Sequence, residues 1–118
     1  MRTIDAITEI LKREGVEYLS CFPTTPVIEA AAAAGIRPIV CLQERVGVGI
    51  ADWFSRVTNG ERMGVFAMQY GPGAENAYSG VATAYSDSVP VLFLPLGHPT
   101  DKQGILPHFD SMRNYQGV

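Results

Sequence analysis

A short apolar run, Ile39-Val40-Cys41-Leu42, leads directly into Gln43-Glu44-Arg45-Val46-Gly47-Val48-Gly49-Ile50-Ala51-Asp52. The apolar run predicts a buried strand of a parallel sheet, which delivers the lone carboxylate of Glu44 to the carboxyl end of that strand. Open α/β sheets bind their ligands at this edge, so Glu44 is placed where an acid can take part in chemistry. The alternative is that Glu44 is only an acid in the first turn of the next helix, where the helix dipole favours a negative charge.

Helix and strand patterns alternate along the chain. Apolar residues at helical spacing predict helices over residues 4–11, 27–34, 46–57 and 74–85, and apolar runs predict strands over residues 16–22, 38–42, 63–69 and 89–96. The third helix is marked by a stripe of large residues, Val46, Ile50, Trp53 and Val57. From Gly97 onward no periodicity remains. We therefore predict an α/β fold: a three-layer, doubly wound, mostly parallel sheet of at least four strands with helices on both faces.

Length and charge limit the classes of protein to consider. The chain has 118 residues, 47% of them hydrophobic, which suffices for one packed core and not for two. The net charge is -3 and no run of Lys or Arg occurs, so binding to nucleic acid or to an anionic membrane is not expected. No stretch approaches the roughly 20 apolar residues of a membrane span, and no signal-peptide pattern opens the chain, so we expect a cytoplasmic protein.

The two cysteines, Cys21 and Cys41, stand at the ends of apolar runs. Their spacing matches no metal site, so we expect reduced, buried thiols.

The turn Gly71-Pro72-Gly73 follows the third predicted strand and opens the fourth predicted helix, where a glycine-rich turn can hold a phosphate. A dinucleotide site is disfavoured, because Asn76 replaces the third glycine, Pro72 lacks a backbone donor and Glu75 adds a negative charge. Two other interpretations are a purely structural turn and a turn whose backbone approaches a flat, uncharged group.

Taken in order, these residues form a longer pattern: Glu44, then Ala51-Asp52, Phe54, Arg56 and Thr58, then Gly71-Pro72-Gly73 with Asn76, then Gly80, Ala82, Thr83-Ala84-Tyr85 and Asp87-Ser88-Val89-Pro90. This pattern resembles the N-terminal pyrimidine-binding (PYR) domain of thiamine-diphosphate-dependent enzymes of the acetolactate synthase and 2-oxoacid decarboxylase superfamily, over residues 4 to about 110. The resemblance implies that residues 1–118 form such a domain, which we expect to be incomplete at its carboxyl end.

The resemblance also implies roles for individual residues. In that family the acid matching Glu44 hydrogen-bonds a ring nitrogen of the cofactor's aminopyrimidine and favours the imino tautomer that gives the ylid. Glu44 is therefore the implied catalytic residue, and the implied cofactor-binding residues are Glu44, Gly71, Pro72, Gly73 and Asn76, with the glycine turn against the pyrimidine ring. The candidate substrate-side residues are Thr24, Thr25, His98, His108 and Phe109.

Several positions depart from the family pattern. Gln43 stands where His is common, the loop over residues 22–26 replaces a Pro-Gly-Gly type loop, Trp53 replaces a small residue and His98 replaces Gln. The Gly-Asp-Gly motif that holds pyrophosphate and magnesium in the family does not occur. The aspartates are single acids without metal-site spacing, so we expect no metal site in this chain.

The implied cofactors are thiamine diphosphate and Mg²⁺, the latter held by a domain absent from this chain. The implied partners are a pyrophosphate-binding domain in the same or another chain, a further copy in a homodimer or larger assembly, and a small 2-oxoacid substrate. The complete enzyme would carry out acetolactate-synthase-like carboligation or decarboxylation, while this chain alone would be inactive. Small residues on two helices predict a partner-facing surface: Gly47, Gly49 and Ala51 on one, Ala74, Ala77, Gly80 and Ala84 on the other.

Two alternatives remain from the sequence. The chain could be a non-catalytic regulatory or partner domain that keeps the fold, or an α/β module that binds a dinucleotide or another small ligand.

Overall fold

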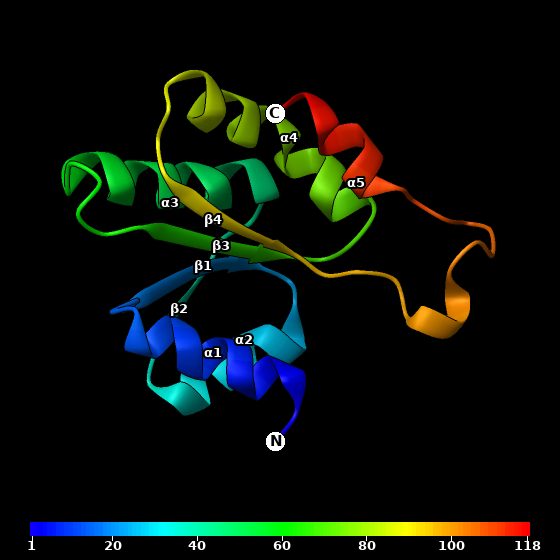
Figure 1. Ribbon diagram of the computed structural model, residues 1–118, viewed down its shortest axis with the longest axis horizontal. Coiled ribbons are helices and arrows are strands. Elements are labelled where there is room, and N and C mark those ends of the chain that lie inside the picture. The colour runs from blue at the N-terminus through cyan, green and yellow to red at the C-terminus, as the bar shows by residue number, and fades with distance from the viewer.

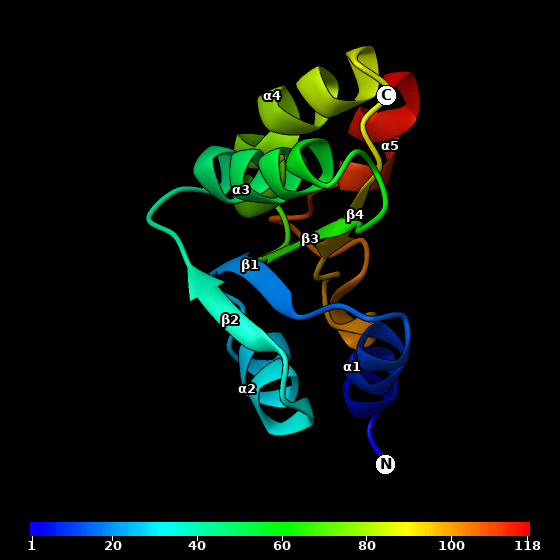
Figure 2. The ribbon, with the colours of Figure 1, turned by 90° about the vertical axis from the view of Figure 1, so that its left-hand side faces the viewer.

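Four parallel strands form the middle layer of the molecule in the computed structural model, which describes residues 1–118 (Figure 1). The strands are β1 (Tyr18–Phe22), β2 (Arg37–Val40), β3 (Gly64–Met68) and β4 (Val91–Pro95), and their order in the sheet is β2-β1-β3-β4. β1 pairs with both neighbours, since Ser20 lies opposite Ile39 of β2 and Phe66 of β3. Figure 2 shows the sheet between two helical layers, with β2 at one edge.

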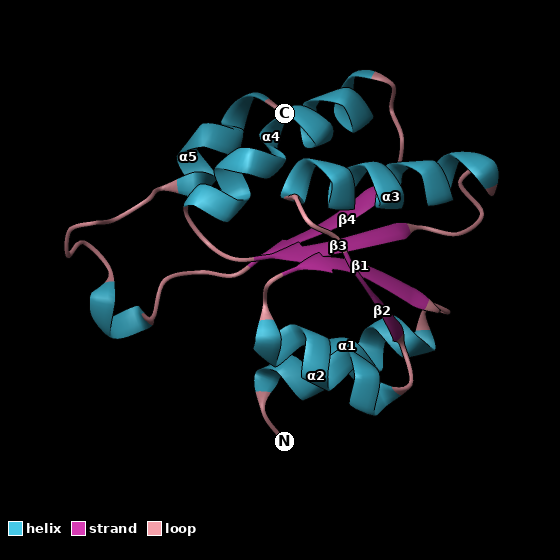
Figure 3. Ribbon diagram, turned by 180° about the vertical axis from the view of Figure 1, so that it is seen from behind, coloured by secondary structure: helices cyan, strands magenta, loops and turns pink.

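Helices cover both faces of the sheet. α1 (Thr3–Arg13) and α2 (Thr25–Ala34) lie on one face, and α3 (Glu44–Val57) and α4 (Pro72–Ser86) lie on the other (Figure 3). The predicted α/β, doubly wound fold is confirmed, with every expected helix and strand present. The region after Gly97, which has no periodicity, contains three short elements: η1 (Thr100–Lys102), α5 (Ser111–Asn114) and η2 (Tyr115–Gly117).

The central strand β3 supplies both faces of the sheet with apolar side chains. Val65 and Ala67 join the core beneath α1 and α2, while Phe66 and Met68 join the core beneath α3 and α4. This alternation is the period of two that a strand imposes, and burial on both faces is typical of a central parallel strand. Alternate residues of β3 therefore contribute to the two hydrophobic cores on opposite faces of the sheet.

The two cysteines lie in different cores, Cys21 with α1 and α2 and Cys41 with α3 and α4. Both are free and buried, as the sequence predicts. Burial raises the pKa of Cys21 to about 11 and also raises the pKa of Cys41, since desolvation disfavours a thiolate. Both side chains therefore remain neutral thiols and act as small core residues.

α3 packs against α4 and the sheet through its smallest residues. A side chain at Gly80 of α4 would place its Cβ 2.8 Å from the Cβ of Val48, and a side chain at Gly47 would meet the ring of Phe66. Ala51 and Ala77 are buried in the same layer. The small residues that the sequence assigns to a partner surface are thus used mainly inside this chain, because close helix packing leaves no room for larger ones.

The stripe of large residues on α3 lies on its outer side. Val46, Trp53 and Val57 are exposed by 50%, 66% and 63%, and Ile50 is half-buried. The stripe correctly marks a helix but does not mark its buried face. The reason is close packing, since the buried residues of α3 beyond Glu44 are small: Gly47, Val48, Ala51 and Ser55.

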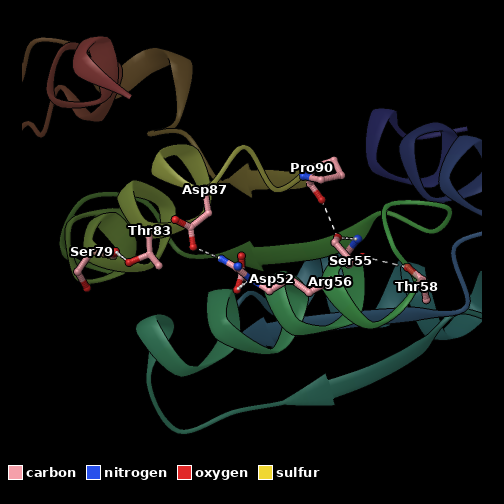
Figure 4. A network of polar contacts seen from close by, with 9 residues as sticks. Asp52, Ser55, Arg56, Thr58, Ser79, Thr83, Asp87 and Pro90 are labelled. Carbon is pink, nitrogen blue, oxygen red and sulfur yellow. Dashed lines mark hydrogen bonds and ion pairs between the residues drawn. The ribbon is translucent and has the colours of Figure 1, made fainter.

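A polar network joins α3 to the end of α4 and to the neighbouring strands (Figure 4). The Arg56 guanidinium donates to Asp52 at 2.8 Å and to Asp87, the residue just after α4, at 2.7 Å. Ser55 donates its hydroxyl to the carbonyl of Pro90 at 2.6 Å and accepts the N–H of Gly64 at 2.8 Å. Asp52, Arg56 and Asp87, which carry part of the family resemblance, therefore connect secondary-structure elements.

Replacing Ser55 by alanine tests the buried part of this network. Ser55 is 1% exposed, so removing its hydroxyl leaves the Pro90 carbonyl and the Gly64 N–H buried without a hydrogen-bond partner. We expect the free energy of unfolding to fall by about 2–4 kcal/mol, since each buried polar group left without a partner costs roughly 1–3 kcal/mol. Urea unfolding measures the change. Ser86→Ala, at the exposed end of α4, is the matched control, and equal unfolding midpoints for the two variants would contradict the expectation.

Candidate active site

The site lies at the carboxyl edge of the sheet. Because all four strands are parallel, the loops after β2 and β3 emerge at the same edge, and each leads into a helix on the same face. Glu44 is the first residue of α3, and Gly71 and Pro72 begin α4. The topology thus brings the acid and the glycine turn together, as the sequence predicts.

Glu44 is a nearly buried carboxylate, with 7% of its surface exposed. Its Oε2 accepts a hydrogen bond from Nδ2 of Asn76 in α4 at 3.3 Å. Its Oε1 lies by the glycine turn, since a Cβ built on Gly73 would be 3.3 Å from that atom. Oε1 has no hydrogen bond within the protein. It is still accessible, because the fully buried side-chain oxygens without a hydrogen-bond partner are those of Thr24 and Asp52. Glu44 therefore has one oxygen that is hydrogen-bonded to Asn76 and one that is free to accept or donate a hydrogen bond to a ligand.

A polar hollow of about 300 Å³ lies beside this carboxylate. Its walls are exclusively polar and come from both helices: Gln43, Glu44, Arg45, Asn76 and Ser79. Glu44 also occupies the first turn of α3, the end of a helix at which acidic residues are generally favoured. The sequence raised two interpretations of Glu44, an acid in the first turn of a helix and an acid that takes part in chemistry. They are compatible, because Glu44 begins α3 and also has an oxygen available to a ligand.

The glycine turn has a conformation and surroundings that favour residues without side chains. Gly71 has a φ of 60°, in the left-handed region that favours glycine. A Cβ on Gly71 would lie 3.0 Å from the ring of Phe109, and a Cβ on Gly73 would crowd Glu44. The turn thus lies between an acid on one side and an aromatic ring on the other.

A second and larger hollow, of about 1020 Å³, opens at the end of β4. Its apolar walls include Phe93, Leu96 and Met112. Its polar groups include His98, whose ring lies 4.3 Å from that of Tyr70 and 5.1 Å from that of His108 between centroids. The Nε2 of His98 accepts the backbone N–H of Phe109 at 3.3 Å. The structure therefore brings His98, His108 and Phe109 together beside the glycine turn.

The segment after β4 is attached to the first turns of α4. Asn114 donates to Glu75 at 2.7 Å, and the Tyr115 hydroxyl donates to the carbonyl of Ala74 at 2.5 Å. The Tyr115 ring also packs on Tyr78 and Phe93, and its burial raises the pKa of the hydroxyl, keeping it a neutral donor. Sequence reasoning did not find Tyr115, and the only signal was an aromatic residue in a region without periodicity.

The remaining candidate residues lie apart from these hollows. Thr24 is buried just before α2, and Thr25, the first residue of α2, is exposed. Neither lines the hollow at Glu44 or the hollow at β4. The loop after β1 is therefore on the same edge of the sheet but is not joined to Glu44.

The side chains of His, Cys, Asp and Glu form no group of three or more that could hold a metal ion. None of the helices has the length and apolar character needed to span a membrane.

Comparison with known proteins gives one family. Residues 1–117 match the family described as "Thiamine pyrophosphate enzyme, N-terminal TPP binding domain". The chain is 35% identical over 94 residues to the acetolactate synthase large subunit of Haemophilus influenzae, covering 76% of this chain and 16% of that protein. It is 36% identical over 103 residues to the probable acetolactate synthase large subunit of Methanocaldococcus jannaschii, covering 85% of this chain and 17% of that protein. It is 34% identical over 97 residues to the sulfoacetaldehyde acetyltransferase of Rhodobacter capsulatus, covering 78% of this chain and 16% of that protein. The chain thus spans about 16% of the length of these relatives.

Proposed function

The chain belongs to the family of N-terminal domains that bind thiamine pyrophosphate (thiamine diphosphate) in acetolactate-synthase-like enzymes, and from this premise we propose that Glu44 is the acid that acts on the bound cofactor. One observation carries the proposal: a nearly buried carboxylate keeps one oxygen open beside a turn of glycines. An acid that only began a helix would not need this arrangement.

The residues present fit an aminopyrimidine, which is flat, uncharged and bears ring nitrogens that accept hydrogen bonds. Gly73 leaves the space before Oε1 of Glu44 free, because any side chain there would come within 3.3 Å of that oxygen. Gly71 and Gly73 would allow the backbone to approach a flat ring closely. The proposed cofactor-binding residues are accordingly Glu44, Gly71, Pro72 and Gly73, with Asn76 in the wall of the hollow beside Glu44.

When bound, thiamine diphosphate supplies a carbon acid that attacks a substrate carbonyl once its proton has been removed. Glu44 would hold a proton at Oε1 and share it with a ring nitrogen of the aminopyrimidine. Its near-complete burial strengthens this hydrogen bond, since few water molecules compete for either partner. The glycine turn would orient the ring, and the apolar residues of the second hollow would keep water from the reacting atoms.

The diphosphate and Mg²⁺ are assigned in this proposal to a pyrophosphate-binding domain in the same protein or on another chain. The glycine turn is poorly suited to a phosphate, because Pro72 has no N–H and Glu75 lies in the first turn of α4. The proposed substrate is a small 2-oxoacid, and the proposed reaction is carboligation or decarboxylation by the complete protein. His98, His108 and Phe109 are the proposed substrate-side residues, and Thr24 and Thr25 are more distant candidates.

Binding and turnover by the complete polypeptide that carries this chain test the proposal. Calorimetric titration with thiamine diphosphate in the presence of Mg²⁺ is expected to show saturable binding, and pyruvate is expected to release CO₂ only when both are added. Binding without turnover of any 2-oxoacid would favour the regulatory-domain alternative. Binding of NAD⁺ in place of thiamine diphosphate would favour the dinucleotide alternative and overturn the proposal.

The exposed outer face of α3 supports the further proposal that the complete protein is a dimer or larger assembly. Trp53, at 66% exposure, is the largest residue of this face. We expect Trp53→Asp to weaken self-association by about 30-fold or more, the effect of losing an aromatic anchor worth at least ~2 kcal/mol. Sedimentation over a wide concentration range measures it. Glu14→Lys, an exposed change just after α1 on the other side of the sheet, is the control, and unchanged association of both variants would contradict the proposal.

A further inference from the structure

The two oxygens of Glu44 have different surroundings, and one residue is responsible for the difference. Nδ2 of Asn76 reaches across from α4 to Oε2 of Glu44, at 3.3 Å, and it is the hydrogen-bond donor to this carboxyl group. Oε1 is left beside Gly73 without a protein partner. The contact joins residues 32 positions apart in the sequence, so it exists only because α3 and α4 pack together.

We propose that Asn76 is a positioning residue that determines which oxygen of Glu44 carries the acid proton. A carboxamide nitrogen only donates hydrogen bonds, so Oε2 must accept and cannot hold a proton on the same side. The proton of the neutral acid is thereby directed to Oε1, the oxygen beside the glycine turn. This inference rests on the proposed function of Glu44, and it gives Asn76 a role through Glu44 rather than through the cofactor.

The alternatives open to the Glu44 side chain explain why such a residue is needed. A glutamate has three rotatable side-chain bonds, and the adjoining 300 Å³ hollow also contains Gln43, Arg45 and Ser79. An ion pair with the neighbouring Arg45 would draw the carboxylate away from the glycine turn. Asn76 holds the group from the opposite helix with a neutral donor, which fixes its position without placing a positive charge beside it.

The close packing of α3 on α4 fixes the geometry of the Asn76–Glu44 contact. Gly80 lies one turn beyond Asn76 in α4, and Val48 lies one turn beyond Glu44 in α3. Because Gly80 has no side chain, Val48 packs directly on the α4 backbone: a Cβ at Gly80 would be 2.8 Å from the Cβ of Val48. The distance between Asn76 and Glu44 is therefore set by backbone packing and does not depend on flexible surface residues.

Substitutions at position 76 in the complete polypeptide test the proposal. We expect Asn76→Ala to lower kcat by about tenfold, the effect of losing one hydrogen bond to the carboxyl group of Glu44, while the Kd for thiamine diphosphate changes by less than about threefold. Asn76→Asp should lower kcat further, because an ionised aspartate repels Glu44 and cannot donate. A purely space-filling role predicts the opposite order, since aspartate and asparagine have nearly the same shape.

A double-mutant cycle shows whether Asn76 acts through Glu44. In the Glu44→Gln background, Asn76→Ala is expected to cause no further loss of kcat, because the proton that it directs is already absent. Thr83→Ala is the matched control, since it removes a polar group from the exposed side of the same helix, where the hydroxyl bonds only to the Ser79 carbonyl. Equal losses from Asn76→Ala in both backgrounds, or a change confined to Kd, would overturn the proposal.

A measurement without cofactor separates this inference from the proposed function. In protein labelled with ¹⁵N-asparagine, the side-chain amide resonances of Asn76 are expected to shift in Glu44→Gln and to stay unchanged in Thr83→Ala. Absence of a shift in Glu44→Gln would show that the contact does not exist and would overturn the inference. A protein that shifts as expected but fails to bind thiamine diphosphate would refute the proposed function alone.

Discussion

Glu44→Gln in the complete enzyme is expected to keep the fold and most of the cofactor affinity and to lower turnover by about 10²–10⁴-fold, the range for loss of a positioned general acid or base. Glutamine is nearly isosteric with glutamate, and its carbonyl can still accept the hydrogen bond from Asn76. Its amide then lies beside the glycine turn and can donate a hydrogen bond, but it cannot release a proton. Ground-state binding should therefore change less than the rate.

The exchange of the thiazolium C2 proton with solvent deuterium is the measurement closest to this step. We expect slow exchange in the Glu44→Gln enzyme loaded with thiamine diphosphate and Mg²⁺, and wild-type exchange in Glu61→Gln, which removes an exposed acid between α3 and β3. Wild-type exchange rates in the Glu44→Gln enzyme would mean that Glu44 serves only as the acid in the first turn of α3.

The fold and the position of the acid were predictable because they depend on local patterns and on topology. Apolar runs separated by helical stretches require parallel strands, and parallel strands place the residues that follow them at one edge. Glu44 and Gly73 therefore had to lie at the same edge of the sheet. The glycines at positions 71 and 73 were also informative, because few other residues tolerate such turns.

The orientation of α3 could not be predicted from the spacing of its large residues. Helical periodicity normally identifies the buried face by hydrophobicity, and here it selects Val46, Trp53 and Val57, which are exposed. The buried face is formed by Gly47, Val48 and Ala51, because α3 is in close contact with both the sheet and α4. In such a tightly packed layer, small size identifies the core better than hydrophobicity does.

The contacts that complete the site depend on tertiary packing and leave no local signal. The Asn76–Glu44 hydrogen bond follows from the spacing of two helices. The tilted ring contacts of His98 with Tyr70 and His108 join the loop after β3 to the segment after β4. Phe109 and Tyr115 come from a segment without periodicity. Phe109 is placed by its contacts with His98 and Gly71, and Tyr115 by its contacts with Phe93 and the Ala74 carbonyl.

Gly64→Ala is expected to lower the free energy of unfolding by at least about 3 kcal/mol, at the upper end of the cost of overpacking. Gly64 begins β3 directly beneath α3, and a methyl group there would overlap the backbone carbonyl of Ala51. A backbone atom cannot turn aside as a side chain can, so α3 would have to move away from the sheet. The same movement would break the hydrogen bond from the Gly64 N–H to Ser55.

Gly49→Ala is the matched control, and its expected effect has the opposite sign. Gly49 lies within α3, and an added Cβ there would have no atom within 4 Å. Alanine should stabilise the helix by about 0.5–1 kcal/mol, because glycine loses more backbone entropy on folding. Urea unfolding followed by circular dichroism compares the two variants. If Gly64→Ala were as stable as Gly49→Ala, α3 would be free to shift on the sheet, and the position of Glu44 at the start of that helix would not be fixed by this contact.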